Sequence, residues 1–145
     1  MPKERSYHHG NLKAELLKAA LSLIRETGSH GFTLREVARR AGVSHNAPYR
    51  HFQDKDDLLV AVAVEGFARL TSAMKQSAAR GKTPLERFRL CGRGYIQFAL
   101  HWPQHFLVMF DLPSTLGTNP DYARAGEEAF ATLLGFIVDV RIPVL

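Results

Sequence analysis

Residues 32–59 read FTLREVARRAGVSHNAPYRHFQDKDDLL, and this stretch carries the densest local folding signals in the chain. Thr33 and Glu36 have the spacing of a capping box, in which two side chains satisfy free N–H groups at a helix start. Gly42 follows one short helix later and has no Cβ to resist a positive φ, so it suits a tight turn. The stretch therefore predicts a short helix that ends in a sharp change of chain direction.

Two further helices are predicted after this turn, the first from Ser44 to about Phe52 and the second from Asp54 to about Ala79. Ser44 and Asp54 are residue types whose side chains accept hydrogen bonds at a helix N-cap. Pro48 lies close enough to the helix start to be tolerated there. Phe52 is expected to be the buried anchor of this unit, which resembles a helix-turn-helix.

The rest of the chain shows the same helical periodicity, and no segment alternates with period two over the length of a strand. We expect further helices over about residues 12–27, 84–102 and 120–140, with a short one around 106–110 and a loop over 112–118. The predicted fold class is all-α. It consists of an N-terminal three-helix head that a long helix joins to a helical C-terminal domain.

Charge is unevenly distributed along the chain, whose net charge is +5. Residues 1–53 carry nine Lys and Arg against four Asp and Glu, whereas the other 92 residues carry ten of each. A basic head on a neutral body fits the binding of an anionic partner such as nucleic acid better than a uniformly basic protein would. The single cysteine, Cys91, is expected to be a small buried hydrophobe. Without a membrane span or an export signal in the sequence, we expect a cytoplasmic protein with no membrane partner.

The second short helix carries side chains suited to the major groove of DNA. Asn46 pairs well with adenine edges, and Ala47 and Pro48 suit the methyl group of thymine. Arg50 and Lys55 suit phosphates. The candidate DNA-contacting residues are Thr33, Arg35, Ser44, His45, Asn46, Ala47, Pro48, Tyr49, Arg50, His51 and Lys55.

Aromatic residues gather in the C-terminal domain, where they suit either a plain core or the wall of an apolar pocket. The candidate ligand-binding residues are Phe98, Trp102, Phe106 and Phe110. The sequence shows no paired nucleophile and base, no glycine loop that would cradle phosphate, and no metal-ligand spacing. We therefore expect no enzyme activity, no cofactor and no metal site.

Three segments of the head, residues 33–44, 49–52 and 55–59, strongly resemble the DNA-binding domain of tetracycline-repressor-like (TetR/AcrR) regulators. The resemblance spans about residues 11–63. It implies a homodimer whose two recognition helices enter successive major grooves of a palindromic operator. It also implies a C-terminal domain that binds a small apolar or aromatic effector and thereby changes the separation of those helices.

The resemblance divides the chain into a flexible basic arm (1–10), a helix-turn-helix domain (11–60) and an effector-binding and dimerisation domain (61–145). Regulators of this kind usually carry two more long helices after the last one expected here, so we expect the C-terminal domain to be truncated. The predicted function is a ligand-responsive transcriptional repressor. The alternative is a helical effector-binding or protein-interaction module whose DNA-binding switch is impaired by the truncation.

Overall fold

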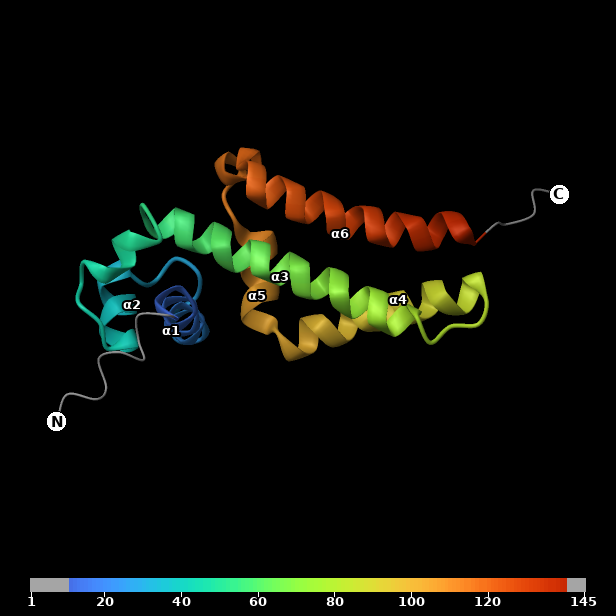
Figure 1. The fold of residues 1–145 in the computed structure, drawn as a ribbon, viewed down its shortest axis with the longest axis horizontal. Helices are drawn as coiled ribbons and strands as arrows, with labels where there is room; N and C mark the ends of the chain where they lie inside the picture. Colours follow the sequence, from blue (N-terminus) through green and yellow to red (C-terminus); the bar gives the residue numbers. More distant parts are fainter. Residues whose placement is uncertain (1–10, 141–145) are drawn as a thin grey trace. The chain divides into compact units, whose positions relative to one another are not determined.

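The computed structural model describes residues 11–140, which form six α-helices and two short 3-10 helices and contain no strand (Figure 1). The α-helices are α1 (Leu12–Thr27), α2 (Leu34–Ala41), α3 (Lys55–Ala78), α4 (Pro84–His101), α5 (Pro103–Asp111) and α6 (Pro120–Asp139). The 3-10 helices are η1 (Ala47–Arg50) and η2 (Ser114–Thr118). The predicted all-α fold class is confirmed. The arm predicted over residues 1–10 lies outside the described residues.

Four helices begin where a polar side chain caps them. In each case the capping oxygen accepts a hydrogen bond of 2.8–3.2 Å from a backbone N–H of the first turn, which is otherwise without a partner. The cap residues are Thr33, Asp54, Thr83 and Asn119. Asn11 occupies the cap position of α1 but makes no side-chain cap bond.

A boundary between Val62 and Ala63, inside α3, divides the chain into two compact units. In the first unit, α1 packs against α2, and α2 contacts η1. The face of α1 that is buried carries Leu16, Ala20 and Leu23 at the i, i+4, i+7 spacing of a helix stripe. Phe52 is also buried, as the sequence predicts for the anchor of the head.

An exposed ion pair ties α2 to α1 in this unit. The guanidinium of Arg40 donates to both carboxylate oxygens of Glu26, at 2.7 and 2.9 Å, and to the hydroxyl of Ser22 at 2.8 Å. The hydrogen bond from Arg40 lowers the pKa of Glu26. Bidentate pairing fixes the geometry of both side chains, so Arg40 is held at the α1–α2 seam.

The second unit contains the rest of α3 with α4, α5, η2 and α6; α4 packs against both α5 and α6 (Figure 1). Two glycines mark places of very close helix approach. A Cβ added at Gly94 of α4 would lie 2.6 Å from the carbonyl oxygen of Ala73 on α3. A Cβ added at Gly66 of α3 would lie 2.5 Å from the sulfur of Met109 on α5. These glycines let α4 and α5 pack directly on α3.

The segment over residues 112–118, predicted as a loop, contains η2. Leu116 N–H donates to the Pro113 carbonyl at 2.9 Å, and Asn119 N–H donates to the Leu116 carbonyl at 3.0 Å. These i to i+3 bonds suit a short Pro-, Ser- and Gly-rich stretch, because 3-10 turns need only a few residues. Farther along, the hydroxyl of Tyr122 donates to the Met109 carbonyl at 2.8 Å and so joins α6 to α5.

Cys91 is fully buried in the second unit, and this burial raises the pKa of its thiol. The prediction of a buried small hydrophobe is confirmed. Within residues 11–140, no helix combines the length and the apolar character needed to cross a lipid bilayer.

Candidate nucleic-acid interface and apolar cavity

The turn between α2 and η1 is built by Gly42, which has φ 71° and ψ 30°, in the left-handed region. Its N–H donates to the Arg39 carbonyl at 3.1 Å, and Val43 N–H donates to the Ala38 carbonyl at 3.0 Å. These bonds satisfy carbonyl groups left free at the end of α2, in the manner of glycine C-caps. The chain therefore leaves α2 along a fixed path.

The second short helix is much shorter than predicted, and its start is displaced. A single 3-10 turn, η1, replaces the helix expected from Ser44 to Phe52, and its N-cap is Asn46, not Ser44. The reason is Pro48, which has no N–H to donate to the Ser44 carbonyl four residues earlier. That carbonyl instead accepts from Ala47 N–H at 2.9 Å, an i to i+3 bond.

The predicted DNA-contacting residues around η1 separate into an exposed and a buried set. The exposed residues are Ser44, His45, Asn46, Tyr49, Arg50 and His51. Ala47 is only 6% exposed, and Pro48 is among the fully buried side chains. Both residues belong to the core of the head, so they offer little surface for the contact to a thymine methyl that the sequence predicts.

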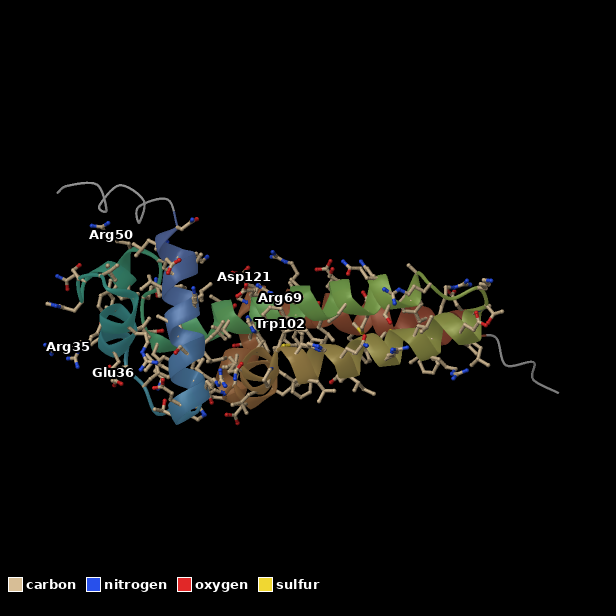
Figure 2. All side chains as sticks on the ribbon, turned by 90° about the horizontal axis from the view of Figure 1, so that it is seen from below. Arg35, Glu36, Arg50, Arg69, Trp102 and Asp121 are labelled. Atoms are coloured by element: carbon tan, nitrogen blue, oxygen red, sulfur yellow. The ribbon has the colours of Figure 1, made fainter. Side chains whose placement is uncertain are left out.

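Cations on α2 and α3 differ in what holds them. Arg35 and Arg39 are exposed on α2, and Figure 2 shows Arg35 and Arg50 projecting away from the ribbon of this unit. Lys55 is half-buried: its ammonium donates to the His30 carbonyl at 2.8 Å and lies 4.6 Å from the centre of the Phe32 ring. Because these contacts hold the Lys55 ammonium against the loop before α2, it is less available for the phosphate contact that the sequence predicts.

Thr33 also has a structural duty, because its hydroxyl both caps α2 and donates to the Glu36 carboxylate at 3.2 Å. The exposed Arg39 was not among the predicted contacts. It lies in the last turn of α2, directly before the Gly42 turn. The sequence shows that Arg39 lies close to the turn. Only the structure distinguishes it from Arg40, whose guanidinium forms an ion pair with Glu26.

A cavity of about 220 Å³ lies between the helices of the second unit. Helices α3, α4, α5 and α6 all contribute side chains to its wall. The lining residues are Phe67, Leu70, Met74, Tyr95, Phe110, Gly126, Ala129, Phe130 and Leu133. No charged side chain is among these described lining residues.

Of the four predicted ligand-binding residues, only Phe110 lines this cavity. Phe98 is buried in the core, and Phe106 lies behind the wall, with its ring centre 4.9 Å from that of Phe110. Trp102 is half-covered by Arg69, whose guanidinium lies 4.3 Å from the centre of the indole ring. Aromatic content located the right helices, but it could not show which face of each helix meets the cavity.

Arg69 lies beside Trp102 (Figure 2) and belongs to a polar cluster that connects α3 to α5. Nε2 of the buried His105 lies 3.2 Å from one oxygen of Glu65, whose other oxygen accepts from Arg69 at 2.8 Å. Burial raises the pKa of Glu65, but the hydrogen bonds from Arg69 and His105 together outweigh it and leave that pKa below its ordinary value. Within residues 11–140, no group of three or more His, Cys, Asp or Glu side chains is placed to hold a metal ion.

Comparison with known families identifies the head. The family described as "Bacterial regulatory proteins, tetR family" matches residues 16–62, which include α2, the Gly42 turn, η1 and the start of α3. Residues 16–62 thus belong to the TetR family. The predicted helix-turn-helix head and the family resemblance are thereby confirmed. The matched family is one of bacterial regulatory proteins, which agrees with the expectation of a regulator rather than an enzyme.

Curated TetR-like regulators share this head with the chain. The HTH-type transcriptional activator FasR of Mycolicibacterium smegmatis is 29% identical over 99 residues, which cover 68% of this chain and 45% of FasR. The HTH-type transcriptional regulator BetI of Serratia proteamaculans is 36% identical over 63 residues, covering 43% of this chain and 32% of BetI. The chain matches about a third to a half of the length of these relatives.

Solved structures extend the likeness beyond the head. A protein of unknown function from Rhodococcus sp. RHA1 is 34% identical, with a TM-score of 0.80 over 94% of this chain and 71% of that one. A TetR family transcription regulator from Marinobacter aquaeolei VT8 has a TM-score of 0.71 at 23% identity, over 91% of this chain and 69% of that one. The TetR fold thus includes the second unit as well as the head.

Proposed function

We propose that this chain is a sequence-specific DNA-binding regulator of transcription that acts as a ligand-responsive repressor. The observation that carries the proposal is the exposed polar surface directly after the Gly42 turn. Ser44, His45 and Asn46 form its first part and Tyr49, Arg50 and His51 its second. This arrangement offers short hydrogen-bonding side chains at the point where a helix-turn-helix protein meets DNA.

The exposed residues divide into two roles by their chemistry. Asn46 and His45 have short amide and imidazole side chains that reach base edges, and Asn pairs with adenine through two hydrogen bonds. Ser44, Tyr49, Arg50 and His51 are suited to phosphate oxygens, as is the exposed Arg35 on α2. Thr33 and Lys55 support this surface by fixing the start of α2 and the loop before it.

We propose that two copies of the chain bind a palindromic operator, because a single head reads only one half-site. Exposed apolar side chains on α4 and α6 support self-association, since contiguous apolar surface often marks an interface. These residues are Ile96, Leu100, Leu134, Ile137 and Val138. In a dimer that places both heads on one face of the duplex, the contacts at both half-sites contribute to the affinity for the operator.

The effector of this regulator is proposed to be a small apolar or aromatic molecule that binds the cavity of the second unit. Three long helices and α5 form the cavity wall, and α3 also runs into the head. A ligand that binds one arrangement of these helices better than another shifts the population toward that arrangement. Release of operator DNA on ligand binding is the outcome proposed.

The test begins with selection of binding sites from a random DNA pool by the full chain. The selected duplex is then titrated by fluorescence anisotropy at several salt concentrations, with a shuffled duplex as the control. We expect a palindromic site bound by two copies, with log affinity falling linearly with log salt. A protein that selects no sequence above the shuffled control would instead be an effector-binding or interaction module.

A further inference from the structure

The wall of the cavity is unusually uniform in its chemistry. Eight of its nine described lining residues have side chains without nitrogen or oxygen, and Tyr95 carries the only hydroxyl. A carboxylate or ammonium group placed against this wall would lose its hydration and gain no partner of opposite charge, which is strongly unfavourable. The wall therefore selects an uncharged molecule.

Aromatic rings form a connected chain behind and along the wall. Tyr95 meets Phe106 edge-to-face at 5.9 Å, and Phe106 meets Phe110 at 4.9 Å. Phe110 in turn meets Phe67 edge-to-face at 5.9 Å, and Phe67 meets Tyr122 at 5.6 Å. Ring faces and edges presented in this way favour an aromatic guest, because edge-to-face pairs add stabilisation beyond area burial.

The hydroxyl of Tyr95 makes no hydrogen bond to any residue among 11–140. Tyr122, by contrast, donates its hydroxyl to the Met109 carbonyl. No buried side-chain oxygen among the described residues lacks a partner, so the Tyr95 hydroxyl is open to solvent, and a ligand that displaces water from it would take over as its hydrogen-bond partner. Tyr95 is therefore the one polar group on the wall that a ligand could satisfy.

The size of the cavity limits the ligand to a single ring. A cavity of roughly 150 Å³ binds benzene, with six carbon atoms. Scaled to the cavity of about 220 Å³ observed here, that ratio gives room for about nine non-hydrogen atoms. Pockets for larger, drug-sized ligands span roughly 300–1,000 Å³. A single-ring compound with a short alkyl substituent fills this volume, whereas a long acyl chain is too large to be enclosed.

We infer that the cavity takes an uncharged single-ring aromatic molecule with one hydrogen-bonding substituent that meets Tyr95, a small alkylphenol being the type. This inference rests on the proposed effector role of the cavity and specifies the chemical class of the effector. Phe110 and Phe130, both more than half exposed, form the rim through which such a molecule enters.

Calorimetric titration of the full chain without DNA tests the inference with three probes of similar size and with the long-chain palmitate ion. The probes are 4-ethylphenol, ethylbenzene and benzoate. We expect 4-ethylphenol to bind, ethylbenzene to bind roughly three- to tenfold more weakly through loss of one hydrogen bond, and benzoate not to bind. Tight binding of benzoate, or of the long-chain palmitate ion, would overturn the assignment.

Variants then locate the binding site. Tyr95→Phe is expected to make 4-ethylphenol bind no better than ethylbenzene. Gly126→Leu fills the cavity and is expected to abolish binding of both, whereas Gly135→Leu, with nothing within 4 Å of its added Cβ on the same helix, leaves binding unchanged. Ala129→Leu, another lining position, serves the same purpose if Gly126→Leu does not fold. Unchanged binding in the cavity-filling variant, or equal loss in the Gly135 control, would refute the proposed location.

This experiment also separates two kinds of failure. Binding of 4-ethylphenol to the protein without any effect on its DNA complex would leave the ligand class standing and remove the ligand-responsive part of the proposed function. Release of DNA by a charged or long-chain molecule, with no binding of 4-ethylphenol, would leave the regulator standing and remove the ligand class.

Discussion

The seam between α3 and α4 depends on the missing side chain of Gly94, and replacing it with alanine is the sharpest test of the packing in the second unit. The added Cβ would lie 2.6 Å from the Ala73 carbonyl oxygen and 2.9 Å from Cβ of Ser77. Carbon atoms in contact lie about 3.5 Å apart, so the two helices must separate by roughly 0.6 Å. A helix carbonyl cannot rotate out of the way as a flexible side chain could.

Gly92 provides a matched control two residues earlier on the same helix, because a Cβ there meets nothing within 4 Å. Alanine is favoured over glycine inside a helix by about 0.8–1 kcal/mol, so Gly92→Ala should be stabilised by up to that amount. Gly94→Ala has the same gain, but overpacking costs about 1–3 kcal/mol. The two variants should therefore differ by about 1–3 kcal/mol in free energy of unfolding.

Thermal unfolding followed by circular dichroism at 222 nm measures this difference. For a chain of 145 residues, 1 kcal/mol corresponds to about 2–4 °C, so Gly94→Ala should unfold roughly 2–12 °C below Gly92→Ala. Because Tyr95 follows Gly94 in the chain, the displaced seam should also weaken ligand binding in the cavity. A Gly94→Ala variant as stable as Gly92→Ala would show that α3 and α4 do not approach as closely as described.

Two further changes test the head and the polar cluster. Thr33→Ala removes the cap of α2 and should lower the free energy of unfolding by about 1 kcal/mol, as measured by urea denaturation; an unchanged midpoint would contradict the cap bond to Glu36 N–H. The pKa of Glu65 is lowered in the folded state, so its stabilising effect is fully present above the ordinary carboxylate pKa and is lost as pH falls through the folded-state value. Urea midpoints measured from pH 7 to pH 3 should therefore decline less steeply in Glu65→Gln than in the unchanged chain, and parallel declines would contradict the pairing with Arg69 and His105.

Helix boundaries were predictable because their signals are local. Thr33 and Asp54 cap the helices at which their side chains were expected, since each bond spans only three residues. The same local chemistry explains the main error. Pro48 was expected to be tolerated near the helix start. Because it has no N–H, it cannot make the bond to the Ser44 carbonyl that an α-helix starting at Ser44 needs.

The cavity was not predictable because it depends on contacts between distant residues. Leu70, Tyr95 and Leu133 come from three helices and lie far apart in sequence. Helical periodicity shows that each helix has an apolar face, but it does not show where several apolar faces leave a space. The burial of Ala47 was not predictable either, because a small side chain is compatible with both surface and core positions.

The central claim is that the surface after the Gly42 turn reads DNA sequence through Asn46 and holds the backbone through Arg50. Its most direct test is the affinity of Asn46→Ala and Arg50→Ala for the selected operator and for single-base variants, measured across a salt series. Asn46→Ala should lose about 1–3 kcal/mol of discrimination at one base pair in each half-site and keep the salt dependence. Arg50→Ala should weaken all sequences alike and reduce the salt slope by about one per contacting head. Unchanged binding in both variants would contradict the proposed docking.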